Sequence, residues 1–173
     1  MALNWDEIEG FSKREFAPPV KPDHEWEMHP GIMDALSSIR RLGIYKYKEF
    51  RILIHTNGGY SVDGHSKKSL HYQGRASDFH MEHYSDNHKC WALVPWLDQV
   101  MLLNQAVSGE NYGVGLHPNW NQQGFHLDYR LGVKGGAVWW DRGGKYKTYG
   151  HQSFGDAVMD VLYYEFKKQD AGV

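Results

Sequence analysis

A ten-residue stretch near the middle of the chain, Ser69 to Asp78 (SLHYQGRASD), places a histidine and an aspartate seven positions apart. On a helix that spacing would set the two residues roughly 10.5 Å apart, too far to share an ion, but Gly74 between them permits a tight turn. A histidine on a loop and an aspartate on the strand after the turn can converge on one ion. Neutral imidazole and carboxylate both bind zinc, at roughly 2.0–2.2 Å. We therefore predict that His71 and Asp78 are metal ligands.

A third ligand is expected from the stretch 124–130 (GFHLDYR), which alternates apolar and ionisable residues. On a strand, His126, Asp128 and Arg130 would point to one face and the residues between them to the other. We predict His126 as the third ligand of a single zinc ion. Asp128 lies roughly 6.6 Å further along the strand, within reach of a water on the metal. Three protein ligands leave a fourth position for water, which is the catalytic arrangement.

The pattern Ser-x-His-x-x-Gly-Arg-Ala-x-Asp resembles the signature of the zinc D-alanyl-D-alanine peptidases. Phage L-alanyl-D-glutamate endolysins and the hedgehog signalling domain share the fold and metal site of that family. The residues Gly113-Val114-Gly115, Phe125 to Asp128 and Trp139 are similar to the branch with a carboxypeptidase C-terminal-type domain. The resemblance covers most of residues 11–140. It implies His71, Asp78 and His126 as zinc ligands and peptides of the bacterial cell wall as substrate.

Two departures from the family pattern refine the expected activity. Many members carry an active-site arginine in a Ser-Gly-Tyr-Arg stretch, whereas this chain has Gly58 to Ser61 (GGYS), which favours an endopeptidase over a carboxypeptidase. Several members place Glu or Asp three residues before the last histidine, where this chain has Gln123, which cannot take up a proton. Asp128 is then the first candidate for the general base, and His117 is the second.

Substrate contacts are expected from two arginines and two aromatic residues. Guanidinium groups bind carboxylates through two parallel hydrogen bonds, so Arg75 and Arg130 are candidates for docking substrate carboxylates. Tyr60 and Trp139 are candidates for bordering the cleft, and packing in the core is the alternative for each. Three further histidines, at positions 80, 83 and 88, are irregularly spaced and indicate a solvated loop rather than a second metal site.

The elements that must position these residues follow from periodicity. Apolar residues at helical spacing predict helices from Pro30 to Gly43, from Pro95 to Ala106 and after the N-cap Ser153. Short runs of apolar and β-branched residues predict strands at 50–55, 76–80, 112–117, 124–130 and 136–140, with 1–30 and 60–75 irregular. The order predicts an α+β fold with a small antiparallel sheet flanked by helices. By resemblance this fold is hedgehog/DD-peptidase-like, and residues 1–173 form one domain.

Composition excludes several classes of protein. The 173 residues carry a net charge of −2, which argues against a general nucleic-acid binder. No apolar run approaches the roughly 20 residues that span a membrane, so membrane insertion is not expected. The N-terminus lacks the basic and apolar regions of a secretory signal. One cysteine excludes an intrachain disulfide, and we expect a monomer.

The sequence therefore predicts a zinc-dependent peptidoglycan peptidase of the endolysin type, from a phage or prophage. It would be made in the cytoplasm without a signal peptide, and act on the cell wall after release or as part of a phage particle. Two alternatives remain open at this point. One is a non-catalytic zinc-bearing module that docks to the wall or belongs to a phage particle, and the other is an unrelated small hydrolase.

Overall fold

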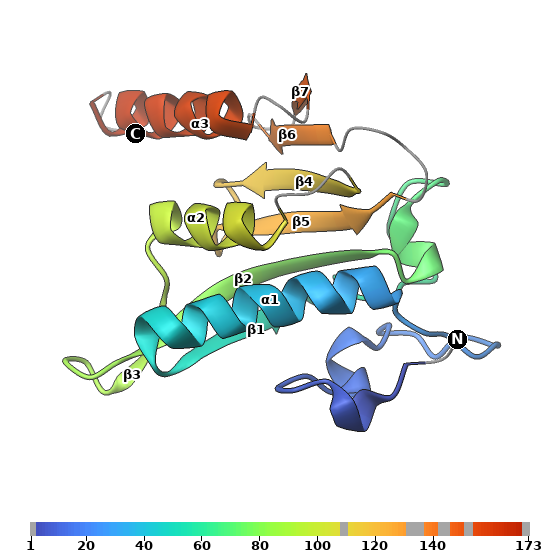
Figure 1. Ribbon diagram of the computed structural model, residues 1–173. Helices are drawn as coiled ribbons and strands as arrows, with labels where there is room; N and C mark the ends of the chain where they lie inside the picture. The colour runs from blue at the N-terminus through green and yellow to red at the C-terminus, as the bar shows by residue number, and fades with distance from the viewer. Residues whose placement is uncertain (1–2, 108–110, 131–136, 142–145, 151–153, 171–173) are drawn as a thin grey trace.

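The computed structural model describes residues 3–107, 111–130, 137–141, 146–150 and 154–170. Seven strands of the described chain form one sheet in the order β1-β2-β5-β4-β6-β7, with β3 also paired to β2 (Figure 1). The strands are β1 Phe50–Ile54, β2 Ala76–Ser85, β3 Cys90–Leu93, β4 Tyr112–His117, β5 Gly124–Tyr129, β6 Ala137–Asp141 and β7 Tyr146–Gly150.

The α+β class is confirmed, but the sheet is not the small antiparallel one that was predicted. Neighbouring strands are antiparallel except β4 and β6, which are parallel. The sheet is mixed because β6 pairs with β4 in parallel, on the edge opposite to β5. The short strands β3 and β7 were not predicted, and they make the sheet larger than expected.

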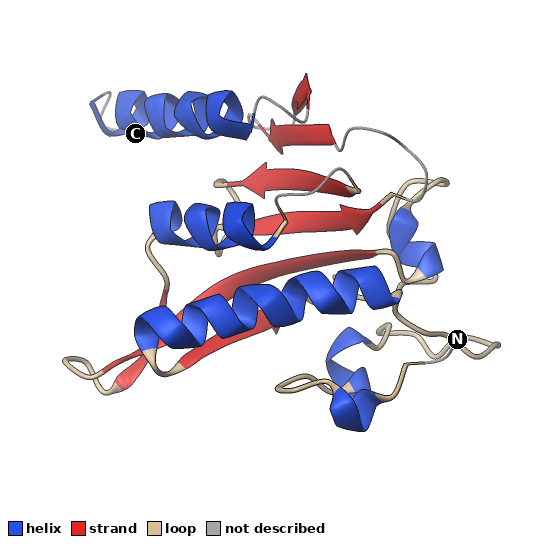
Figure 2. Ribbon diagram, in the orientation of Figure 1, coloured by secondary structure: helices blue, strands red, loops and turns tan. Residues whose placement is uncertain are grey.

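Three α-helices and three short 3₁₀ helices complete the described structure (Figure 2). They are η1 Trp5–Glu7, η2 Lys13–Phe16, α1 Pro30–Tyr47, η3 Leu70–Gln73, α2 Trp96–Ala106 and α3 Phe154–Asp170. Helix α1 starts as predicted at Pro30, where the His29 side chain accepts a hydrogen bond from the Gly31 amide. The predicted stop at Gly43 is wrong, and the helix continues for one more turn. A Cβ at position 43 would lie 2.4 Å from the Phe50 ring, so this glycine serves packing.

The core lies between the sheet and the helices. In Figure 1, α1 and α2 cross the near face of the sheet. Phe79 and Phe125 of the sheet are fully buried there, and the Trp96 ring of α2 stacks on Phe125 at 4.9 Å between centroids. The buried Gln99 side chain joins α2 to the sheet, because it donates to the Val94 carbonyl and accepts from the Met81 amide.

The opposite face of the sheet carries ionisable side chains. Because side chains alternate along a strand, Asp78, His80 and Glu82 of β2 lie on the face away from Phe79. Asp78 is paired in register with His126 of β5, so both side chains lie on this face. The fold thus supplies one apolar face that binds the helices and one polar face that can hold a site.

Two further predictions concern the start of α3 and membrane-spanning helices. The N-cap at Ser153 lies outside the described residues, although α3 does begin directly after it. Within the described parts of the chain, no helix is both long and apolar enough to cross a membrane.

Candidate metal centre

The ten-residue motif has a clear structural basis. Its first residue, Ser69, caps η3, with its Oγ accepting from the His71 amide at 3.3 Å. Gly74 then ends η3 in the left-handed conformation, with φ of 63°. A Cβ at this position would lie 2.0 Å from the Glu27 carbonyl oxygen, so only glycine fits. The turn at Gly74 brings the chain into β2, which carries Asp78 back beside His71.

The backbone carbonyls of Gly58 and Gly59 accept hydrogen bonds from the two predicted ligands. The Gly59 carbonyl oxygen lies 2.9 Å from His71 Nδ1, which must donate because a carbonyl only accepts. His71 therefore has its lone pair on Nε2, the atom that faces Asp78 and His126. The Gly58 carbonyl accepts from the Asp78 amide at 2.7 Å, and a Cβ on Gly58 would lie 2.6 Å from the Asp78 carbonyl oxygen.

The three predicted ligands converge. His71 Nε2 lies 3.3 Å from His126 Nδ1 and 3.5 Å from Asp78 Oδ1. Asp78 Oδ1 and His126 Nδ1 are 2.7 Å apart and share a hydrogen bond. Tetrahedral ligands of zinc at roughly 2.1 Å lie roughly 3.4 Å from one another, so the first two separations suit one ion. The donor set of two imidazoles and one carboxylate also suits zinc.

A further histidine beside these residues was missed. The His65 ring stacks on the His71 ring at 4.1 Å between centroids. One ligand atom from each of His65, His71 and Asp78 lies within 4.8 Å of the others, so this trio could also hold a metal ion. The His65 Nε2 is bound to the Asn57 carbonyl at 3.0 Å. We favour His126 as the third ligand because its Nδ1 lies 3.3 Å from His71 Nε2 and 2.7 Å from Asp78 Oδ1, whereas His65 Nε2 is held by a backbone carbonyl.

Asp128 lies behind His126 and not beside the other two ligands. Its Oδ2 is 3.4 Å from His126 Nε2, and Arg130 donates to both of its oxygens at 2.6 and 3.0 Å. Burial would raise the pKa of Asp128, but the bonds from His126 and Arg130 outweigh it and lower the pKa to about 2. These contacts suit a residue that orients a ligating histidine.

The carboxylates on either side control the charge of His126. Burial would lower the pKa of His126, but the hydrogen bonds to Asp128 and Asp78 outweigh it and raise the pKa to about 9. Burial likewise opposes ionisation of Asp78, yet the hydrogen bond from His126 and the neighbouring His71 ring hold the pKa of this carboxyl far below its usual range. Asp78 is therefore ionised, and a cation can replace the proton on His126 Nδ1.

Gly115 of β4 makes room for two rings beside this centre. Gly115 is paired with His126, and a Cβ there would lie 2.8 Å from Trp139 Nε1 and 2.9 Å from His117 Nε2. His117 and Trp139 therefore meet over Gly115, next to His126. The Trp139 ring is 5.3 Å from the His126 ring, whereas Trp140 is buried in the core.

The other predicted substrate residues are differently placed. Arg130 lies with its guanidinium 5.5 Å over the Trp139 ring, at the edge of the centre. Arg75 donates to the Tyr129 carbonyl at 2.6 Å. Tyr60 is buried, stacks on Trp26 and has its hydroxyl 2.6 Å from His24 Nε2. Packing, which was the alternative for Tyr60, is what the structure has.

A second polar cluster lies further along the same face of the sheet. His80 is buried in β2, so its predicted place in a solvated loop is wrong: β2 extends to Ser85 because β1 and β3 both pair with it. Its Nδ1 is 2.9 Å from His55 Nε2, and its Nε2 is 3.3 Å from Glu82 Oε1. Arg51 donates to Glu82 Oε2 at 2.9 and 2.6 Å. We call this chain, from Arg51 through Glu82 and His80 to His55, the histidine relay.

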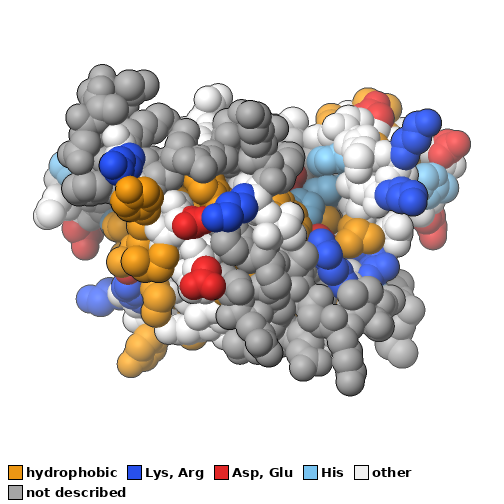
Figure 3. All heavy atoms as spheres, turned by 90° about the horizontal axis from the view of Figure 1, so that it is seen from above, with side chains coloured by type: hydrophobic (Ala, Val, Ile, Leu, Met, Phe, Trp, Pro, Cys, Tyr) orange, Lys and Arg blue, Asp and Glu red, His pale blue; other side chains and the backbone are white. Residues whose placement is uncertain are grey.

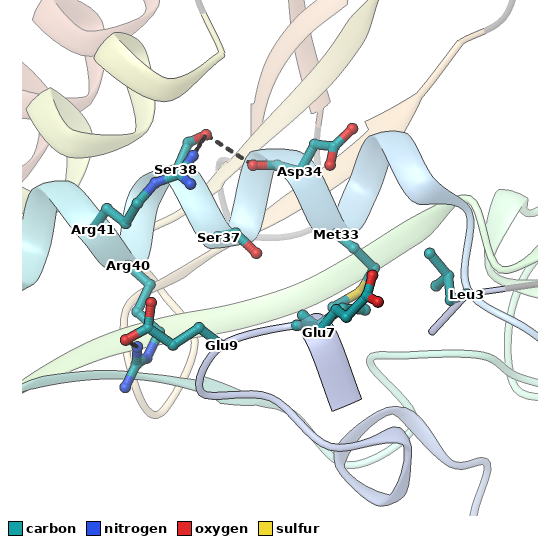
Figure 4. A pocket seen from close by; sticks show the side chains of 10 residues that line it. Leu3, Glu7, Glu9, Met33, Asp34, Ser37, Ser38, Arg40 and Arg41 are labelled. Carbon is teal, nitrogen blue, oxygen red and sulfur yellow. Dashed lines mark hydrogen bonds and ion pairs between the residues drawn. The ribbon is translucent and has the colours of Figure 1, made fainter. Parts of the chain in front are cut away.

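Histidines gather on one part of the surface, and a separate cavity lies elsewhere on the molecule. Figure 3 shows histidine side chains reaching the surface toward the end of the molecule that carries η3 in Figure 1. A separate cavity of about 420 Å³ lies between the N-terminal segment and α1 (Figure 4). Its charges are mixed, with Glu7, Glu9 and Asp34 near Arg40 and Arg41. None of the three predicted zinc ligands lines it.

Comparison with known proteins adds no relative. No family model matches the chain, and no curated protein matches it. The resemblance to the zinc peptidases therefore rests on the motif residues and on the geometry that they adopt.

Proposed function

We propose that the protein is a zinc-dependent peptidase of peptidoglycan, with His71, Asp78 and His126 as the ligands of one ion. The observation that carries the proposal is the convergence of His71 Nε2, Asp78 Oδ1 and His126 Nδ1 within 3.5 Å of one another on the polar face of the sheet. When bound, a zinc ion supplies an activated water and polarises the scissile carbonyl.

The side chains around the ligands divide the remaining tasks. The carbonyl of Gly59 and the carboxylate of Asp128 fix the two ligating imidazoles, which keeps their lone pairs aimed at one point. His117 Nε2, which lies beside Gly115 and so near His126, is a candidate for the general base alongside Asp128, whose oxygens both accept hydrogen bonds from Arg130. The His117 ring reaches over Gly115 to the side of His126.

Substrate would bind across Trp139 and Arg130. A guanidinium has five N–H donors, and Asp128 engages two of the Arg130 nitrogens, which leaves donors for a substrate carboxylate. Stem peptides of the cell wall carry such carboxylates along their length. We propose an endopeptidase of the endolysin type in the hedgehog/DD-peptidase fold, because Ser61 stands where the carboxypeptidases have arginine.

The direct test is digestion of purified sacculi, with release of peptide fragments measured by mass spectrometry. Wild-type protein loaded with zinc should release fragments, and His71→Ala and Asp78→Ala should not. The matched control is His83→Ala, which removes a histidine of β2 whose ring stacks on Tyr47 instead. Equal digestion by all four proteins would contradict the proposal.

A second candidate is a zinc-bearing wall-binding module without activity. The specific observation in its favour is the engagement of Asp128 by Arg130 and His126, together with Gln123 in place of an acidic residue. Zinc bound at one ion per chain, with sacculus binding but no released fragments, would select this candidate.

A further inference from the structure

A second cavity opens beside the metal centre, at the end of the histidine relay. It has a volume of about 700 Å³ and is lined by Leu53, His55, His80, Trp120 and the amide side chains of Asn119, Asn121 and Gln122, among others. No Lys, Arg, Asp or Glu of the described chain lines it. The position follows from the sheet: His80 is two residues from Asp78 on the same face, roughly 6.6 Å along β2.

The relay sets which way the His55 ring presents its lone pair. The Glu82 carboxylate accepts hydrogen bonds from Arg51 and has no donor to offer, so His80 Nε2 must donate to it. His80 Nδ1 is then an acceptor, and His55 Nε2 must donate to it. This leaves Nδ1 as the acceptor of the His55 ring, so His55 is arranged to receive a hydrogen bond from an O–H or N–H group.

An aromatic wall faces the same space. The Trp120 ring stacks on His117 at 3.9 Å between centroids and 11° between planes, which holds it in place from behind. It meets His55 at 5.0 Å and 53°. A rigid indole surface binds the apolar C–H face of a ligand, and the neighbouring amides can both donate and accept hydrogen bonds.

We infer that this cavity is a subsite for a neutral saccharide that carries hydroxyl and acetamido groups, stacked on Trp120 and hydrogen-bonded to His55. The lining supplies an aromatic surface, amides and one fixed acceptor, but no charge for a carboxylate of a stem peptide. The inference deepens the proposed function and rests on it. It makes the glycan strand, and not only the peptide, the part of the wall that the protein grips.

The test uses the β-1,4-linked trimer of N-acetylglucosamine, titrated into the full chain while tryptophan fluorescence and amide chemical shifts are followed. We expect saturable binding that is roughly fivefold weaker in Trp120→Ala, because an aromatic contact is worth about 1 kcal/mol. Asn121→Ala changes only an exposed amide, keeps the fold, and should weaken binding roughly threefold. Tyr45→Ala, which removes an aromatic ring that is 93% exposed on α1, is the control and should bind as wild type.

A fourth variant separates this inference from the proposed function. His71→Ala lacks a zinc ligand but should bind the trimer as wild type does, so saccharide binding without digestion would leave the subsite intact while peptidase activity fails. Absence of saturable binding to wild type would overturn the inference, as would equal binding by wild type, Trp120→Ala and Asn121→Ala. Competition by a sugar-free stem peptide for the same resonances would overturn the assignment to a saccharide.

Discussion

The candidate metal centre and the histidine relay lie on the same face of one sheet, and their surroundings shift the pKa of their histidines in opposite directions. At the centre, two carboxylates flank His126 and raise its pKa to about 9 despite burial. In the relay, burial lowers the pKa of His55 and His80, and Glu82 accepts hydrogen bonds from Arg51, which compensates its charge. The first arrangement attracts a cation, and the second maintains neutral imidazoles with fixed tautomers.

The difference comes from where the carboxylates stand along neighbouring strands. Asp78 faces His126 directly across β2 and β5, and Asp128 follows two residues later on β5. In the histidine relay the register pairs Arg51 with Glu82. The guanidinium therefore compensates the charge of this carboxylate, which no longer attracts a metal ion. Two sites on one face can therefore differ in chemistry because the register pairs their carboxylates with different residues.

The largest expected effect separates His117 from Asp128 in catalysis. If His117 is the base, His117→Gln should lower the rate of peptide release roughly 10²–10⁴-fold and leave zinc affinity unchanged. Rates at saturating zinc, measured with zinc affinity on the same preparations, check this. A variant that digests sacculi at the wild-type rate would exclude His117 as the base.

Asp128→Asn should act on the metal instead. Loss of the charge behind His126 removes an orienting contact, and such contacts are worth roughly 10–100-fold in metal affinity. Competition with a chromophoric chelator measures the effect. Unchanged zinc affinity with a large fall in rate would reverse the roles of the two residues.

Glu82→Gln should affect stability and spare the metal centre. It removes the charge that binds Arg51 and disturbs the acceptor for the buried His80, which costs about 1–3 kcal/mol in the free energy of unfolding. Urea denaturation of the metal-free protein measures the loss. A fall in zinc affinity comparable with that of Asp128→Asn would mean that the two clusters are not independent.

The stability of the metal-free protein should depend on pH. Because folding raises the pKa of His126 from 6.5 to about 9, the stability from this group is fully present below pH 6.5. It is lost as pH rises through about 9. Denaturation at a series of pH values should show the decline, and His126→Gln should abolish it. A free energy of unfolding that rises over this range would contradict the assigned contacts.

The motif and the alternation of β5 were sufficient to predict that His71, Asp78 and His126 lie together. Both signals are local: a cap, a turn at Gly74 and the alternation of a strand place these side chains without knowledge of distant contacts. Strands β4 and β5 were found for the same reason, within a residue of their ends.

The residues that were missed depend on contacts between distant segments. His65 reaches the centre by stacking from an irregular loop, which has no periodicity to reveal it. The partnership of His55 with His80 needs the register of β1 on β2, which sequence alone does not specify. Gly43 was taken for a helix stop because its packing against Phe50 of the next strand leaves no pattern in the sequence.

The central claim is that His126, with His71 and Asp78, completes the metal site and that His65 only packs beside it. Zinc titration of wild type, His126→Ala and His65→Ala, with bound metal counted per chain, tests it most directly. We expect one zinc ion per chain in wild type, an affinity loss of more than roughly 100-fold in His126→Ala, and a much smaller change in His65→Ala. Wild-type protein without stoichiometric zinc, or zinc retained in His126→Ala and lost in His65→Ala, would contradict the account.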